Sequence, residues 1–119
     1  MTWGEAEINL RENIVINDHL AGFGHYKIVV NTPPYTFNKV DEAFKIKVGK
    51  NSYINISLLM LQLLFEESLT NNNIYNRNVF KKIYPHEYEV KPCYVHSVGK
   101  LFVKANIAVQ LNSRNYRIL

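Results

Sequence analysis

The stretch at residues 58–67 constrains the fold most strongly, because it offers almost no polar face. Its leucines include Leu59, Leu61, Leu63 and Leu64. Ser57 precedes it and is a good helix N-cap, since its hydroxyl can accept a hydrogen bond from a free amide of the first turn. A helix that is apolar nearly all round is buried on several sides. The sequence therefore predicts a central core helix, and 119 residues allow one domain, with or without an appendage, but not two.

Downstream of this helix, the apolar spacing predicts two further helices and then a two-stranded hairpin. Pro85 should end the second helix, and the polar, acidic residues 86–90 should form a loop. Pro92 should open the third helix, because the missing proline amide costs little in a first turn. The predicted elements are a second helix, or a short strand leading into one, at residues 74–84, a third helix from Pro92 onward, and strands at residues 107–111 and 116–119 around a turn at 112–115.

The third helix combines an apolar face with a basic one. Spacings of three and four place toward the core Tyr94, Val95, Val98, Leu101, Phe102 and Ala105. The residues left to point outward are Lys91, His96, Ser97, Lys100 and Lys104. Gly99 lies inside this helix, where glycine costs on the order of 1 kcal/mol relative to alanine. It therefore indicates either a close approach of another segment to the helix backbone or a poorer helix.

Upstream of the core helix, the pattern predicts strands. From residue 7 to residue 30 apolar side chains recur with a period near two, and turn-forming residues lie between Asn17 and Gly24. These features predict an antiparallel β-hairpin that forms an N-terminal extension at residues 1–34, which ends at Pro33 and Pro34. Further short strands are predicted at residues 35–37, 44–48 and 53–56, with a polar turn at 38–42.

Positive charge is concentrated in the C-terminal part of the chain. From residue 76 to residue 119, eight lysines and arginines oppose only Glu87 and Glu89, whereas the preceding residues carry six basic and eight acidic side chains. A basic half joined to a slightly acidic half gives the molecule one face that attracts polyanions. This asymmetry favours a nucleic-acid partner over a uniformly charged surface.

Other features point away from catalysis, metal binding and membranes. The single cysteine, Cys93, excludes an internal disulfide, and histidines in the predicted loops lack the pairing of a metal site. Cys93 and His96 lie one helical turn apart, but no third group that would orient a catalytic base is apparent. The longest apolar stretch is too short to cross a bilayer, and the first residues lack the pattern of a signal peptide. We therefore expect a cytoplasmic protein that is not an enzyme and needs no cofactor or metal.

Several strings resemble segments of one family of transcription regulators. VGKNSYINISLLMLQLLFE is similar to its last N-terminal strand and leucine-rich first helix, YNRNVFKKIY to its second helix, YVHSVGKLFVKA to its recognition helix and SRNYRIL to its C-terminal hairpin. From residue 35 onward, the chain thus resembles the winged-helix effector domain of the OmpR/PhoB family. The resemblance implies an α+β fold, a winged helix-turn-helix with an N-terminal antiparallel β-sheet and a C-terminal β-hairpin wing, at residues 35–119.

The chain also departs from this family pattern. Members usually place arginines in the middle of the recognition helix, where this chain has Gly99, Lys100 and Leu101. Ser113 and Asn115 stand where the wing usually has glycines. The chain is too short for a receiver domain beside the effector domain, and residues 1–34 match no part of the family pattern.

The resemblance implies that the third helix enters the major groove of double-stranded DNA while the hairpin reaches the backbone or minor groove. Phosphate contacts would come from Lys91, Lys100, Lys104, Arg114 and Arg117. Base edges would be contacted by His96, Ser97 and Lys100, with Asn112 or Arg114 in the wing. A homodimer is expected, and RNA polymerase or another regulator are further candidate partners.

The sequence alone leaves one alternative to DNA binding open. In this alternative, the chain is a winged-helix module for protein–protein interaction or dimerisation that does not contact DNA. Residues 1–34 would supply a dimerising or partner-recognising sheet, and the basic charge would either be incidental or complement an acidic partner. This alternative accounts for the scarcity of arginine in the third helix.

Overall fold

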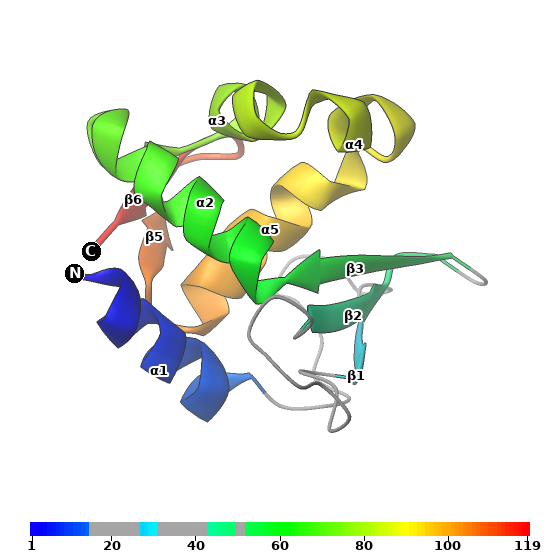
Figure 1. Ribbon diagram of the computed structural model, residues 1–119, viewed down its shortest axis with the longest axis horizontal. Helices are drawn as coiled ribbons and strands as arrows, with labels where there is room; N and C mark the ends of the chain where they lie inside the picture. Colours follow the sequence, from blue (N-terminus) through cyan, green and yellow to red (C-terminus); the bar gives the residue numbers. More distant parts are fainter. Residues whose placement is uncertain (15–26, 31–42, 50–51) are drawn as a thin grey trace.

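The computed structural model describes residues 1–14, 27–30, 43–49 and 52–119, which form an α+β fold of five helices and two small antiparallel sheets (Figure 1). The N-terminal sheet has the strand order β1-β2-β3, and the C-terminal sheet has the order β4-β6-β5. The helices are α1 (Trp3–Asn13), α2 (Leu58–Thr70), α3 (Arg77–Ile83), α4 (Pro85–Val90) and α5 (Cys93–Lys104). The strands are β1 (Lys27–Val30), β2 (Ala43–Lys47), β3 (Tyr53–Ser57), β4 (Ile74–Tyr75), β5 (Ala108–Gln110) and β6 (Tyr116–Ile118).

The first predicted strand is wrong, because its residues form helix α1. The Thr2 hydroxyl accepts a hydrogen bond from the Glu5 amide at 3.2 Å, and the Glu5 carboxylate accepts one from the Thr2 amide at 3.0 Å. This reciprocal capping box satisfies two amides that a helix start otherwise leaves free. Leu10 is fully buried, whereas Ile8 is 55% exposed, so burial does not follow the period of two. The N-terminal hairpin prediction fails with this strand.

Strand predictions further along the chain hold where the structure describes them. Residues 27–30 form β1, and β2 and β3 occupy the segments expected at residues 44–48 and 53–56. Phe44 and Ile46 of β2 are buried and pair in register with Ile56 and Ile54 of β3. The predicted strand at 35–37, the turns at 17–24 and 38–42 and the boundary at Pro33 and Pro34 lie outside the described residues.

Helix α2 lies at the centre of the core, as predicted. The Ser57 hydroxyl caps it by accepting from the Met60 amide at 3.0 Å. The side chains that α2 buries are Leu58, Met60, Leu61, Leu64, Phe65 and Ser68. Its outer side is less enclosed than expected, since Leu59 and Leu63 are 39% and 38% exposed. Helix α1 packs against α2 and adds Ala6, Leu10 and Ile14 to the same core.

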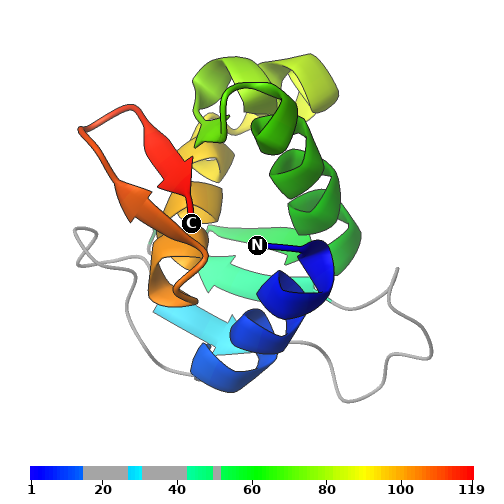
Figure 2. The same ribbon diagram turned by 90° about the vertical axis from the view of Figure 1, so that its left-hand side faces the viewer.

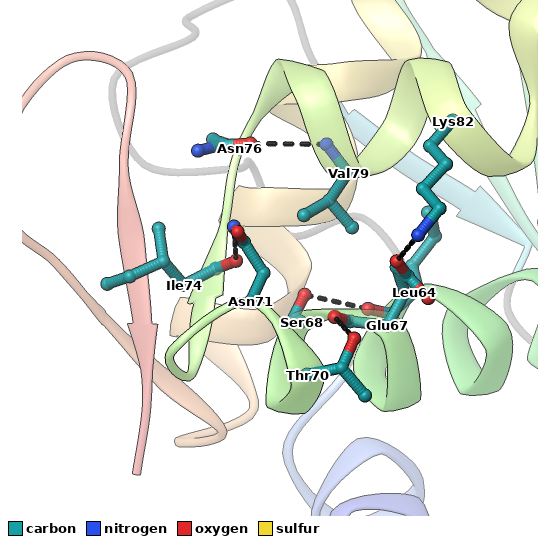
Figure 3. Close-up of polar contacts among 9 residues, drawn as sticks. All are labelled: Leu64, Glu67, Ser68, Thr70, Asn71, Ile74, Asn76, Val79 and Lys82. Atoms are coloured by element: carbon teal, nitrogen blue, oxygen red, sulfur yellow. Dashed lines mark hydrogen bonds and ion pairs between the residues drawn. The ribbon is translucent and has the colours of Figure 1, made fainter.

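A tight polar turn connects α2 to β4, which leads into α3 (Figure 3). Asn72 and Asn73 adopt positive φ angles of 56° and 62°, which asparagine tolerates better than most residues. The Asn71 side chain donates to the Ile74 carbonyl at 2.9 Å, and Lys82 of α3 forms an ion pair with Glu67 of α2. The first contact closes the turn onto β4, and the second holds the last turn of α3 against α2.

The predicted loop at residues 86–90 is wrong, because these residues belong to helix α4. Pro85 ends α3 as expected, but it also occupies the first turn of α4, where no amide is needed. The Tyr88 amide donates to the Tyr84 carbonyl at 3.0 Å across the junction. A proline can therefore separate two short helices without leaving a loop between them.

Helix α5 and the C-terminal sheet pack directly on each other (Figure 2). The predicted core residues of α5 are buried except Tyr94, which is half-buried and stacks on Phe80 at 5.9 Å. A Cβ atom added to Gly99 would lie 2.4 Å from a ring carbon of Tyr116 on β6, so of the two alternatives for this glycine the close approach is the one observed. The outward placement of Ser97 is wrong, because this residue is fully buried and donates to the Cys93 carbonyl at 2.9 Å.

Candidate nucleic-acid interface

A pocket of about 540 Å³ lies where α3, α4, α5 and the turn of the C-terminal hairpin meet. Each of these four segments contributes side chains, and the hairpin turn joins three helices that follow one another along the chain. The residues that line the pocket are Asn76, Arg77, Asn78, Tyr88, Pro92, Cys93, Val95, His96, Arg114 and Asn115. Two of these ten residues, Arg77 and Arg114, carry a full charge, and both charges are positive. The pocket therefore favours an anionic group.

Arg77 and Arg114 approach this pocket from different elements. Arg77 is the first residue of α3, and Arg114 lies in the hairpin turn between β5 and β6. Both residues are exposed, and within the described part of the chain neither guanidinium pairs with a carboxylate. A guanidinium presents a planar fork of N–H donors that matches phosphate or carboxylate oxygens.

Three asparagines connect the hairpin turn to the start of α3. The Asn76 side-chain oxygen accepts from the Val79 amide at 3.1 Å and so caps α3. The Asn76 side-chain nitrogen donates to the Asn115 side-chain oxygen at 3.2 Å. The Asn115 side-chain nitrogen donates in turn to the Asn112 oxygen at 3.1 Å, which also accepts from the backbone amides of Arg114 and Asn115. Asn112, a predicted base contact, therefore shapes the turn through its side-chain oxygen.

His96 faces the pocket from the first half of α5. Burial lowers the pKa of His96, and the charge of Lys100 one helical turn away lowers it further. The imidazole is therefore mainly uncharged at neutral pH. In that form one ring nitrogen donates and the other accepts a hydrogen bond, so His96 brings polarity rather than charge to the pocket.

Lys100 and Lys104 continue along α5 beyond the pocket. The Lys100 ammonium donates to the Gln110 side-chain oxygen at 2.6 Å, and the Gln110 side-chain nitrogen donates to the Asn112 carbonyl at 3.0 Å. Lys100 thus links α5 to the hairpin turn. Lys104 lies in the last turn of α5, where a cation interacts favourably with the helix dipole. Neither lysine lines the pocket.

The remaining predicted contacts lie apart from this surface. Lys91 donates to the Tyr53 carbonyl at 2.8 Å and so reaches toward β3. Arg117 is exposed between the buried residues Tyr116 and Ile118, and strand alternation places it on the hairpin face that points away from α5. Ser97 is buried. The structure therefore brings together His96 and Arg114 with Lys100 beside them, and it separates the other predicted residues.

Several residues of the pocket were not predicted as contacts from the sequence, above all Arg77. Asn76, Asn78 and Tyr88 also received no role. The string Asn-Arg-Asn at residues 76–78 carries one usable signal, because asparagine before a helix is a preferred N-cap. That preference places Arg77 and Asn78 in a first turn, but it does not show that the hairpin turn lies opposite them.

Neither a metal-binding cluster nor a membrane-spanning helix is found among the described residues. These residues include no group of three or more histidine, cysteine or acidic side chains that could hold a metal ion. Within the same ranges, no helix has the length and apolar character needed to cross a membrane. Cys93 and His96 both line the pocket, and Cys93 is half-buried there.

No protein-family model, no curated protein and no solved structure matches this chain.

Proposed function

We propose that the protein is a winged-helix transcription regulator that binds double-stranded DNA through α5, the start of α3 and the C-terminal hairpin. In this proposal, α5 acts as the recognition helix and β5 and β6 form the wing. The order of α2, α3, α5 and hairpin supports it, as does the packing of the hairpin beside α5. Helix α4 would be an additional short element between the second and third helices of the motif.

One observation carries the proposal: Arg77 and Arg114 line the same pocket as the partly buried His96 of α5. Arginine forks recognise phosphate groups through paired hydrogen bonds, and both guanidinium groups are available for such bonds. The asparagines beside them are hydrogen-bonded to each other, which holds α3 and the hairpin turn at a fixed separation. A preformed pair of phosphate contacts would orient α5 on a duplex.

The test measures binding of a fluorescently labelled duplex by anisotropy over a series of salt concentrations. Log affinity should fall linearly with log salt, with a slope of about −0.9 per phosphate contacted. The double variant Arg77→Ala/Arg114→Ala should bind more weakly and reduce the slope by roughly 1.8, because two contacts are lost. Arg11→Ala, the same change on α1, is the matched control and should leave the slope unchanged. Binding that is absent, or that does not depend on salt, would rule out the proposal.

The second candidate is a protein-interaction module, and two lysines favour it. Lys91 and Lys100 donate hydrogen bonds within the chain, to the Tyr53 carbonyl and the Gln110 side chain. A surface whose lysines have internal partners offers fewer phosphate contacts than the sequence suggests.

Leu59 and Leu63 lie one turn apart on α2, each more than a third exposed, and would form part of a contact surface for a protein partner. Sedimentation of the intact chain and of Leu59→Glu/Leu63→Glu tests this role, because self-association that needs these leucines should disappear in the variant.

A further inference from the structure

We propose that the pocket between α3, α5 and the hairpin turn binds a single nucleotide unit, a phosphate joined to a planar base. The inference rests on the proposed DNA-binding function, because the pocket lies in the same surface, but it assigns the pocket a ligand of its own. The volume of about 540 Å³ falls within the range of about 300–1,000 Å³ that is typical of small-molecule sites. The pocket also combines apolar walls with a few polar groups, as such sites do.

The phosphate end of the site is formed by Arg77 and Arg114. Asn76 precedes Arg77, Asn115 follows Arg114, and these two asparagine side chains are hydrogen-bonded at 3.2 Å. The backbone positions of the two arginines are therefore fixed relative to each other by their neighbours. Two guanidinium groups that line one pocket from different elements can share the oxygens of a single phosphate, and no carboxylate lies among the residues that line this pocket.

The base end of the site is formed by Tyr88, Pro92 and Val95. Their apolar surfaces suit the face of a planar ring, and aromatic side chains stack on nucleic-acid bases in many proteins. Asn78 lines the same pocket from the first turn of α3. An asparagine amide pairs well with the edge of adenine, which presents one donor next to one acceptor. An acidic peptide would engage the arginines but would leave this apolar surface and amide unused, so we favour an adenine nucleotide.

Isothermal titration calorimetry on the full chain tests the ligand. Adenosine 5′-monophosphate should bind, and adenosine or inorganic phosphate alone should each bind at least about tenfold more weakly, since each lacks one half of the contacts. Arg77→Ala, Arg114→Ala and Asn78→Ala should each weaken binding of the monophosphate, and the arginine variants should do so by about tenfold or more. Arg11→Ala should have no effect, and unchanged melting temperatures should show that the variants fold. A monophosphate that fails to bind, or binds no tighter than phosphate, overturns the inference.

Competition with labelled duplex DNA separates this inference from the proposed function. If the monophosphate binds and displaces the duplex, the pocket holds a nucleotide of the nucleic-acid chain. If it binds without displacing the duplex, the pocket holds a free nucleotide. Both results support the nucleotide site. Duplex binding that depends on Arg77 and Arg114, together with no binding of the monophosphate, overturns the nucleotide site and leaves DNA binding intact. Binding of the monophosphate without any binding of duplex overturns the proposed DNA binding and leaves the nucleotide site intact.

Discussion

The side-chain nitrogen of Asn76 donates a hydrogen bond to the side-chain oxygen of Asn115 at 3.2 Å, and this bond joins two segments separated by 39 positions. Asn76 also caps α3, and Asn115 lies at the base of the hairpin turn next to β6. The bond therefore sets the distance between the two walls of the candidate site. A surface that binds an extended anion gains affinity when its contacts are already in place before binding.

Replacing Asn76 should destabilise the protein more than replacing Asn115. Asn76→Ala removes the cap on the Val79 amide, which typically costs about 0.5–2 kcal/mol, and also removes the partner of Asn115. Asn115→Ala leaves the cap in place and should cost less. Urea unfolding curves measure both changes, with Asn78→Ala as an exposed control on the same helix. Equal costs for the two variants would mean that the cap contributes little.

Gly99→Ala should destabilise the protein even though alanine is the better helix former. The added methyl would lie 2.4 Å from a ring carbon of Tyr116, and overpacking of this kind typically costs about 1–3 kcal/mol. The expected gain in helix propensity is about 1 kcal/mol. A double-mutant cycle with Tyr116→Leu checks the cause, because the smaller side chain should relieve most of the alanine penalty. A penalty that persists in the Tyr116→Leu background would point to another origin.

Removing the hydroxyl group should destabilise the protein at one buried tyrosine and not at another. The Tyr75 hydroxyl donates to the Val95 carbonyl at 2.7 Å, so Tyr75→Phe should cost about 1 kcal/mol. The Tyr116 hydroxyl is buried and has no hydrogen-bond partner among the described residues, so Tyr116→Phe should be neutral or stabilising. Thermal unfolding of both variants beside the original protein measures the difference. A clear loss of stability in Tyr116→Phe would reveal a partner for that hydroxyl.

Stability should fall with acidification partly because of His96. Burial, followed by the charge of Lys100, lowers the folded-state pKa of His96 below the usual value of 6.5. The unfolded chain therefore binds a proton more readily than the folded chain, and protonation favours unfolding. The resulting penalty is absent well above pH 6.5 and grows as the pH falls below it until the folded-state pKa is passed. His96→Gln should reduce the loss of stability between pH 7 and pH 5, and an NMR titration of the imidazole should give a midpoint below that of a free histidine.

The sequence predicted those elements whose boundaries depend on local chemistry. Ser57 marked the start of α2, the spacing of Val95, Val98 and Phe102 marked the buried face of α5, and the turn after β5 lies where expected. Helix α1 was missed because Ile8 and Leu10 fit a strand pattern as well as a helical one. The capping box of Thr2 and Glu5 is the stronger local signal, because it marks the start of a helix and not of a strand.

The candidate site was less accessible to sequence analysis than the fold. His96 and Arg114 were both named as contacts, but no spacing rule indicates that they share a pocket with Arg77. That arrangement depends on the packing of the hairpin against α5 and on the bond from Asn76 to Asn115. Ser97 illustrates the opposite error, since the helical pattern placed it outside and the surrounding segments cover it completely. Both outcomes depend on how the elements pack in three dimensions, which local spacing does not show.

The contact between Gly99 and the Tyr116 ring also has a mechanical consequence. Tyr116 begins β6, directly after the hairpin turn, and its ring rests on the α5 backbone with no side chain between them. A small tilt of α5 would therefore press directly on the base of the hairpin. Because the turn of the hairpin is bonded to the start of α3, such a tilt would first strain the bond from Asn76 to Asn115. The hairpin therefore resists tilting of α5 at two points, at Gly99 and at Asn76.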